Sequence, residues 1–239
     1  MQRSTRKNWW TSVSYTHLDV YKRQALDGPA GAGKSTIAGR IAKQLGIHHL
    51  DSGALFRAVA LKAIQAGVDT KDETGLAALL QKCQLDIRVQ EGQQHTYLDG
   101  VDVSTEIRAQ EVGQGASDVG TLRCVREFVT RRVREIARGT SLIVDGRDIG
   151  SVMLPEADYK FFLTATPQER ALRRMRQLRE MGKEADLSEI ESEIIARDRQ
   201  DAGREIAPLI QAPDAIVIDS TQDTVEQVVE RMLVHMKQV

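Results

Sequence analysis

Cysteine, tryptophan and long apolar runs are scarce in this chain of 239 residues. The two cysteines, Cys83 and Cys124, are far apart, and the histidines fall at no metal-ligand spacing. We therefore expect a reduced, cytoplasmic setting and no metal held by cysteine or histidine. No apolar run approaches the roughly 20 residues that cross a bilayer, so we do not expect a membrane-spanning protein.

An excess of charge of one sign is also missing. The formal net charge is -1, which argues against a broad basic face that binds nucleic acid. Most of the 33 basic residues are arginine, whose planar fork suits phosphate groups, although genomic composition bias would give the same excess. We expect a monomer with no nucleic-acid or membrane partner.

The first 24 residues differ from the rest. They hold both tryptophans, Trp9 and Trp10, and they show no helical period and no secretory core. Lys22 and Gln24 stand where a buried strand should be apolar. We interpret residues 1–24 as a non-native or disordered tail that supplies polar residues to the first strand. Burying them should lower the stability of the fold by on the order of a few kcal/mol. A native basic tail is the alternative.

From Ala25 onward, apolar strands alternate with amphipathic helices, which predicts an α/β fold with a parallel sheet covered on both faces. The segment from Leu85 to Ser104 changes to a period of two with two turn signals, which predicts a small antiparallel sheet. Helices are expected at 34–45, 52–65, 70–83, 106–116, 122–138, from Pro167, from Ser188 and at 225–236. Capping boxes that begin at Thr166 and Ser188 mark two of the starts.

"GPAGAGKS", from Gly28 to Ser35, matches the phosphate-loop pattern and precedes a good helix. Glycines let backbone N–H groups turn inward around phosphates, Lys34 reaches the β and γ phosphates, and Ser35 can hold magnesium. The alternative is a glycine-rich turn that precedes a helix by chance and binds no phosphate. The residues that we expect to hold ATP are Gly28, Pro29, Ala30, Gly31, Ala32, Gly33, Lys34, Ser35 and Thr36.

"LIVDGRD" ends an apolar strand in Asp145, Arg147 and Asp148. Ligands of open parallel sheets sit beyond the carboxyl ends of strands, so Asp145 is expected to join Ser35 in orienting hydrated magnesium. A solvated turn is the alternative. Further on, a helix places Arg197, Asp201 and Arg204 on one face. They form either an exposed salt-bridge row or an anion and sugar site, and Arg170, Arg173 and Arg174 on the preceding helix favour the second interpretation.

Five segments together resemble the bacterial cytidylate kinase family of phosphate-loop enzymes: "ALDGPAGAGKST", "LDSGALFRA", "DVSTEIR", "VDGRDIGSV" and "ARDRQDAGREIAPL". The resemblance runs from about Ala25 to the C-terminus. It implies transfer of the γ phosphate of ATP to CMP or dCMP with Mg²⁺, on a five-stranded parallel sheet with a CMP-binding insert at about 68–118 and a helical lid at about 167–200.

The resemblance also implies residue roles. Ser52, Arg57, Arg147 and Arg204 would hold the CMP phosphate, Arg197 and Asp201 the sugar, and Ser104, Arg126 and Asp148 the base, with Asp145 beside them. Lys34, Arg147 and Arg174 would neutralise charge on the transferring phosphoryl group. Cytosine has a hydrogen-bond donor at N4 and an acceptor at N3. Uracil has the opposite groups at these positions, so a site built for cytosine should reject UMP.

Two other classes of function fit parts of the sequence. A kinase for another nucleotide or for a shikimate-like acceptor would explain the phosphate loop, but not Ser104, Arg126 and Asp148 at matching sites. A nucleic-acid-binding module would explain the arginines, but the near-neutral charge counts against it.

Overall fold

The computed structural model describes residues 22–90 and 93–237. Within these ranges, a five-stranded sheet has the order β2, β6, β1, β7, β8, and every pair is parallel. The strands are β1 (Arg23–Asp27), β2 (His48–Asp51), β6 (Leu142–Asp145), β7 (Tyr159–Thr164) and β8 (Ile216–Asp219). This sheet confirms the predicted fold class, because parallel neighbours need the helical crossovers that the sequence pattern supplies.

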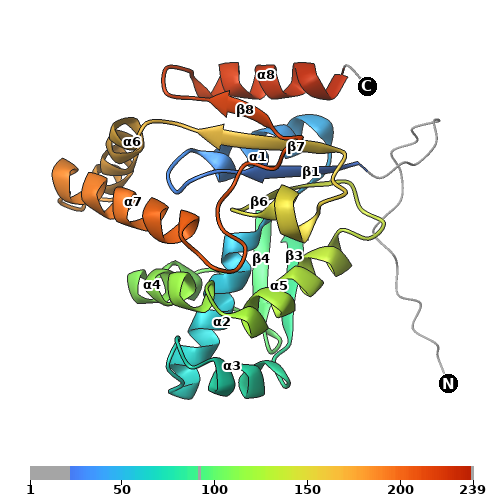
Figure 1. Ribbon diagram of the computed structural model, residues 1–239, viewed down its shortest axis with the longest axis vertical. Helices are drawn as coiled ribbons and strands as arrows, with labels where there is room; N and C mark the ends of the chain where they lie inside the picture. The colour runs from blue at the N-terminus through green and yellow to red at the C-terminus, as the bar shows by residue number, and fades with distance from the viewer. Residues whose placement is uncertain (1–21, 91–92, 238–239) are drawn as a thin grey trace.

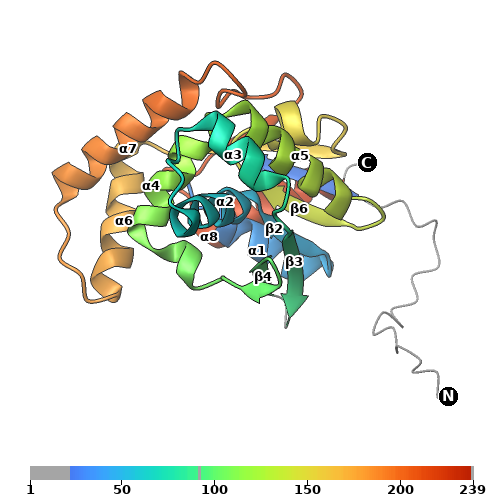
Figure 2. The same ribbon diagram turned by 90° about the horizontal axis from the view of Figure 1, so that it is seen from below.

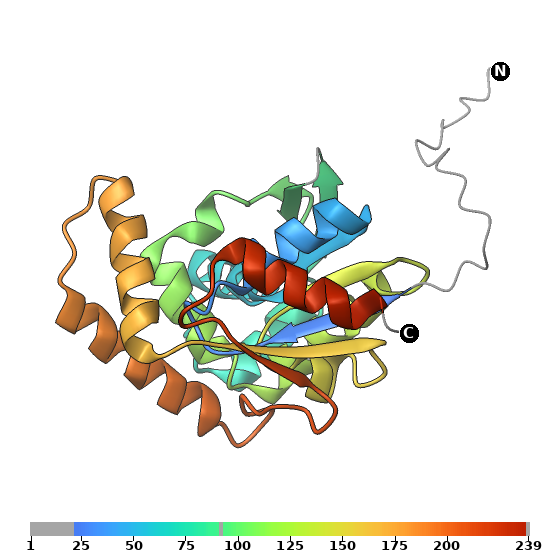
Figure 3. The ribbon, with the colours of Figure 1, turned by 90° about the horizontal axis from the view of Figure 1, so that it is seen from above.

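Helices cover both faces of the sheet, as Figures 1 and 3 show. On one face, α1 (Lys34–Leu45) and α8 (Val225–Lys237) share a core with β1, β7 and β8. On the other face, α2 (Ser52–Ala66) and α5 (Arg123–Ile136) pack over β6. Each helix buries an apolar face of the kind that its sequence period predicts.

The expected insert lies between α2 and α5 and is seen from below in Figure 2. Its helices are α3 (Glu73–Leu80) and α4 (Gln110–Val119), with a 3-10 turn before α4. Its antiparallel sheet is β3 (Leu85–Gln90), β4 (Gln93–Leu98) and β5 (Val101–Asp102). The predicted helix at 70–83 is shorter than expected because Asp72 accepts hydrogen bonds from Thr74 N and Gly75 N and so caps α3.

The expected lid consists of α6 (Pro167–Glu180) and α7 (Leu187–Ala202), which project together from one end of the sheet (Figure 3). Thr166 caps α6 through Glu169 N at 3.3 Å, as predicted. The prediction that Ser188 caps α7 was wrong. Asp186 is the N-cap, because its carboxylate accepts from both Ser188 N and Glu189 N at 2.9 Å.

The two polar residues that the sequence marked as misplaced differ in their surroundings. Lys22 is exposed and precedes β1, and its Nζ donates to the Tyr159 hydroxyl at 3.3 Å. Gln24 lies inside β1 between Ile143 and Tyr159, is buried, and leaves its Oε1 without a hydrogen-bond partner. The expected polar cost therefore falls on Gln24. Residues 1–21 of the predicted tail lie outside the described residues.

No helix in the described part of the chain is both long and apolar enough to cross a bilayer.

Candidate functional site

Four of the five strands end in an aspartate, and three of these residues meet around the loop that follows β1. Asp27 ends β1, Asp51 ends β2 and Asp145 ends β6, with β1 next to β6 and β6 next to β2. Parallel strands bring their carboxyl ends to one edge of the sheet. The sequence thereby concentrates acidic side chains where the phosphate loop begins.

The phosphate loop has the backbone that its glycines were expected to permit. Gly28, Gly31 and Gly33 all have positive φ angles of 145°, 76° and 93°. At Gly28, an added Cβ would lie 2.0 Å from the Leu163 carbonyl oxygen of β7. Only glycine fits so close to a neighbouring strand in that conformation. The loop therefore leaves β1 by a path that another residue would block.

Lys34 lies at the centre of the loop rather than in solvent. It is buried, and its Nζ donates to the carbonyl oxygens of Gly28 and Pro29, both at 2.8 Å. Burial, together with the nearby positive charge of Arg147, holds the pKa of Lys34 well below its usual range. Its ammonium group is thus kept inside the ring of backbone atoms that the motif predicts will surround phosphates.

Ser35 and Asp145 come together as predicted for a magnesium site. Ser35 Oγ donates to Asp145 Oδ2 at 2.7 Å. A hydroxyl and a carboxylate are hard oxygen donors, and magnesium is bound by such groups together with water and phosphate oxygens. The donor set therefore fits this ion.

His49 completes the surroundings of Asp145, and no local pattern in the sequence marked it. His49 Nε2 lies 2.7 Å from Asp145 Oδ1. Burial by itself lowers the pKa of His49, but the hydrogen bond and the charge of Asp145 outweigh it and leave that pKa raised. The histidines fall at no metal-ligand spacing in the sequence, so His49 was given no role there. The pairing of β2 with β6 puts the two residues on neighbouring strands, and only the side-chain contact shows that His49 meets Asp145.

A cluster of arginines surrounds Asp201 on the last turns of α7. Arg147 Nε donates to one oxygen of Asp201 at 2.9 Å, and Arg204 donates to the other. These arginines hold the pKa of Asp201 low despite its burial, which acts the other way. Arg197 and Arg204 each keep a buried Nε without a hydrogen-bond partner. The cluster is therefore a partly satisfied cationic site rather than an exposed salt-bridge row.

Arg57 belongs to the same cluster by its charge. It reaches from α2, and its positive charge helps to lower the pKa of Arg197, after the larger effects of burial and Arg147. Ser52 opens α2 and donates from Oγ to the Asp145 carbonyl oxygen at 2.8 Å. The structure thus brings together the predicted phosphate and sugar residues from three separate segments: Ser52, Arg57, Arg147, Arg197, Asp201 and Arg204.

Arg126 and Asp148 form a buried ion pair, with Nη2 donating to Oδ2 at 2.5 Å. Arg126 Nη1 also donates to the Gly120 carbonyl oxygen at 2.8 Å, and its guanidinium lies over the Phe56 ring, 5.5 Å from the centroid. Each group therefore has fixed partners, as buried charges need. This pair holds a donor and an acceptor side by side.

Two predicted site residues lie apart from these groups. Ser104 Oγ donates to Asp102 Oδ1 and accepts from Thr96 N at 2.9 Å, within the small sheet of the insert. Arg174 is exposed on α6, and its Nη1 donates to Gln177 of the same helix at 2.7 Å. Another serine, Ser117, is buried on the last turn of α4, three residues before Gly120, whose carbonyl oxygen accepts from Arg126.

Asp27 ends β1, and it also anchors the segment after β6. Its two carboxylate oxygens accept from Ile149 N at 2.8 Å and Gly150 N at 2.7 Å, at the start of a π-helical turn (Ile149–Met153). Burial raises the pKa of Asp27 to about 6, and those two hydrogen bonds oppose the shift. Asp27 thus ties the strand before the phosphate loop to the segment that carries Arg147 and Asp148.

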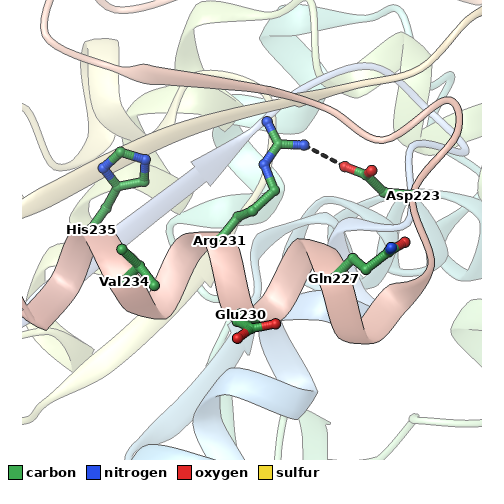
Figure 4. Close-up of a pocket in the computed structure, with 6 residues that line it drawn as sticks. All are labelled: Asp223, Gln227, Glu230, Arg231, Val234 and His235. Carbon is green, nitrogen blue, oxygen red and sulfur yellow. Dashed lines mark hydrogen bonds and ion pairs between the residues drawn. The ribbon is translucent and has the colours of Figure 1, made fainter.

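Two surface hollows differ in their relation to this site. One, of about 470 Å³, is lined by Arg204 and its neighbours from Arg199 to Ile206, together with Thr121. The other, of about 390 Å³, lies over α8, where Arg231 pairs with Asp223 beside His235 (Figure 4). None of the strand-end groups lines the second hollow, so we assign no role in the site to it.

Comparison with known proteins places the chain in a family. The family model described as cytidylate kinase matches residues 24–238. The cytidylate kinase of Caldicellulosiruptor bescii is 46% identical over 209 residues, which cover 87% of this chain and 92% of that protein. The cytidylate kinase of Symbiobacterium thermophilum is 45% identical over 212 residues, which cover 88% and 94%.

A solved structure shows the fold alone. An uncharacterized protein from Eubacterium ventriosum aligns with a TM-score of 0.50 at 11% identity, covering 91% of this chain and 99% of that one. The family assignment depends instead on the sequence matches, since the family model covers residues 24–238 and the two relatives cover 87% and 88% of this chain. The chain belongs to the cytidylate kinase family.

Proposed function

We propose that the protein transfers the γ phosphate of ATP to CMP or dCMP and so forms CDP or dCDP. The observation that carries the proposal is the buried Arg126–Asp148 pair, which lies beside the arginine cluster and the strand ends. A phosphate loop is common to many kinases, whereas a buried donor and acceptor near a phosphate-binding cluster is specific to a polar acceptor.

ATP would bind with its phosphates in the loop from Gly28 to Thr36. Positive φ angles at Gly31 and Gly33 favour inward-facing N–H groups, and α1 adds the positive end of its dipole. Ser35 and Asp145 would hold magnesium, which supplies charge neutralisation on the phosphate oxygens when it is bound. Lys34 needs only to exchange its two carbonyl partners for phosphate oxygens.

The CMP phosphate would bind at the arginine cluster, with Ser52, Arg57, Arg147 and Arg204 as its partners. The unpartnered Nε atoms of Arg197 and Arg204 support an anion here, because buried donors without acceptors are costly. Asp201, held by Arg147 and Arg204, would accept from a sugar hydroxyl together with Arg197. This would place the acceptor phosphate on the same side of the sheet as the phosphate loop.

Arg126 and Asp148 would read the base. Cytosine offers an amino donor to Asp148 and a ring acceptor to Arg126. Uracil inverts both groups, so UMP would set a donor against Arg126 and an acceptor against Asp148 in a buried site. The family resemblance implies Ser104 as the third base contact. We propose Ser117 as the alternative third contact, because it is buried beside Gly120, whose carbonyl oxygen accepts from Arg126.

Catalysis would then depend on alignment and on charge. The transferring phosphoryl group spreads negative charge over its oxygens, so Lys34 and Arg147 would stabilise it from either side. Arg174 is exposed on α6, so it would act only after α6 and α7 close over the site. Closure would also exclude water, which would otherwise accept the phosphate. We also propose that the protein is a monomer in the cytoplasm. The two free cysteines support a reducing compartment.

The direct test is magnesium-dependent ADP formation with CMP, dCMP, UMP, AMP and shikimate as separate acceptors. We expect turnover with CMP and dCMP far above the others. The variant Asp148→Asn should lose most CMP turnover and narrow the gap between CMP and UMP. Turnover led by another acceptor would contradict the proposal.

The serine assignment has a matched pair of variants. Ser117→Ala should narrow the preference for CMP over UMP if Ser117 contacts the base, whereas Ser104→Ala should leave it unchanged. The reverse result would return the role to Ser104.

A further inference from the structure

Arg170 is a buried arginine whose partners join three segments of the protein. Its side chain is 3% exposed, although it lies on the first turn of α6. Nε donates to the Ala165 carbonyl oxygen at 2.9 Å, and Nη1 donates to the Ala30 carbonyl oxygen of the phosphate loop at 2.9 Å. The guanidinium also meets Asp198 of α7 as a fork, with Nη1 to Oδ1 at 3.1 Å and Nη2 to Oδ2 at 2.6 Å.

This contact matters because of how a phosphate loop works. If its N–H groups turn inward to phosphate, some of its carbonyl groups must turn away and find other donors. Arg170 takes the carbonyl of Ala30, and Arg173, one turn further along α6, reaches Ala32 O at 3.4 Å. Lys34 contacts the carbonyls of Gly28 and Pro29, but it would leave them for phosphate oxygens when ATP binds. The carbonyl groups of Ala30 and Ala32 would therefore keep their cationic partners on α6 with the nucleotide bound.

Packing reinforces the hydrogen bond between α6 and the loop. Gly31 has a φ of 76°, and a Cβ at this position would lie 3.3 Å from Arg170 Cβ. The backbone of the loop thus rests against the same side chain that binds Ala30. A bidentate carboxylate fixes the plane of a guanidinium, so Asp198 determines where the remaining donors of Arg170 point.

We propose that Arg170 is a positioning residue for ATP: it holds the phosphate loop through Ala30, and Asp198 holds Arg170. The inference rests on the proposed function, because it assumes that the loop binds ATP. It differs from the sequence interpretation, in which Arg170 was one of the arginines gathered to touch phosphate. The guanidinium instead acts from behind the loop, and the lid helices α6 and α7 are tied to the nucleotide site through it.

The test compares Arg170→Lys, Asp198→Asn and the double variant in the full chain. MgATP affinity is measured by isothermal titration calorimetry, and KM values for ATP and CMP are measured separately. Each single change should weaken MgATP binding about tenfold, as expected for the loss of a charge-assisted contact. The double variant should be no weaker than either single variant, because both changes disrupt one unit. Arg170→Lys should leave the KM for CMP unchanged.

Two further variants guard against trivial explanations. Asp198→Glu keeps the charge and should keep most of the MgATP affinity. Asp214→Asn removes the carboxylate of an exposed ion pair with Lys160 and should not change MgATP affinity. Circular dichroism checks that each variant is folded.

Several outcomes would overturn the proposal. If Arg170→Lys weakens MgATP binding while Asp198→Asn leaves MgATP binding unchanged or makes it stronger, Arg170 contacts ATP directly. If the folded variants bind MgATP as the wild type does, the pair is only structural. A wild-type chain that binds MgATP but does not phosphorylate CMP counts against the proposed function alone, and the variant affinities still decide the role of Arg170. A wild-type chain that does not bind MgATP contradicts both.

Discussion

Gln24 is a polar side chain in the centre of the main sheet. It is 2% exposed, and its Oε1 has no hydrogen-bond partner. A buried polar group without a partner destabilises the folded state, because water satisfied it in the unfolded chain. In the sequence, the same residue interrupts an apolar strand. The structure shows the physical cost of that interruption, which is a buried oxygen without a hydrogen-bond partner.

Replacing Gln24 should therefore stabilise the protein. Gln24→Val is expected to raise the free energy of unfolding by about 1–3 kcal/mol, because it removes the unsatisfied oxygen and favours a strand. Urea denaturation measures this change. Gln93→Val, at an exposed position of β4, is the control and should stay within about 0.5 kcal/mol. A loss of stability in Gln24→Val would mean that Gln24 has a compensating role.

Asp27 should make stability depend on pH. Its pKa is about 6 in the folded protein against an ordinary 3.8, so between these values the folded state binds more protons than the unfolded state. The stability that it contributes below pH 3.8 is therefore lost as the pH rises through about 6. The neighbouring charged groups are Asp148, which adds to the shift, and Lys34, which opposes it.

The comparison variant is Asp27→Asn, which cannot titrate. At about 1.36 kcal/mol for each pKa unit, the whole shift is worth about 3 kcal/mol. From about pH 4 to about pH 7, the stability of the wild type relative to this variant should fall by most of this amount, about 2 kcal/mol. Urea denaturation across that range measures the difference. For Asp214→Asn the difference should stay flat, because Lys160 holds the pKa of Asp214 below its ordinary value. If the stability difference between the wild type and Asp27→Asn did not change with pH, the pKa of Asp27 would not be raised in the folded protein.

At the level of elements, the contact between α2 and α4 depends on a glycine. An added Cβ at Gly115 would lie 3.1 Å from Thr70 Cγ2 and 3.2 Å from Ala60 Cβ. At Gly113, two residues earlier on α4, a Cβ would meet nothing within 4 Å. One helix thus offers two glycines with opposite surroundings.

These two positions give a matched prediction. Gly113→Ala should raise the free energy of unfolding by about 0.5–1 kcal/mol, because alanine loses less backbone entropy in a helix. Gly115→Ala should leave the free energy of unfolding unchanged or lower it, because the added methyl group would force α4 to shift away from α2. Urea denaturation of both variants tests the pair. An equal gain at both positions would contradict the close approach of the helices.

Element boundaries were predicted where a single local signal existed. Thr166 and Pro167 began α6 as expected. Ser188 offered a similar capping box, yet Asp186 prevailed because its carboxylate reaches two backbone N–H groups. The π-helical turn after Asp148 had no signal in the sequence, since it is held by Asp27 and by Arg134, which donates to the carbonyls of Val152 and Met153. Such distant contacts are invisible to a local pattern.

At the level of the whole molecule, a net charge of -1 conceals a strongly positive site. Arg57, Arg147, Arg197 and Arg204 influence one another around a single Asp201. Attraction for a phosphate there should be screened by salt, whereas the recognition of a neutral base should not be.

Binding of CMP should therefore weaken several-fold from about 0.05 M to about 0.5 M KCl, while binding of cytidine should change little. Isothermal titration calorimetry of the two ligands measures this contrast. An equal response of CMP and cytidine would mean that the arginine cluster does not receive the acceptor phosphate.

The sequence by itself determined the fold class, the phosphate loop and the cap of α6, because these depend on residues that are neighbours in the chain. It also marked Asp148 at a strand end and Arg197 and Asp201 on one helix face, whereas Arg126 and the separate roles of these residues came only through resemblance to a family. The tertiary structure alone decided that His49 faces Asp145, that Ser104 is bonded within the insert, and that Arg170 holds Ala30. These contacts join residues far apart in sequence, so strand order and helix packing had to place them.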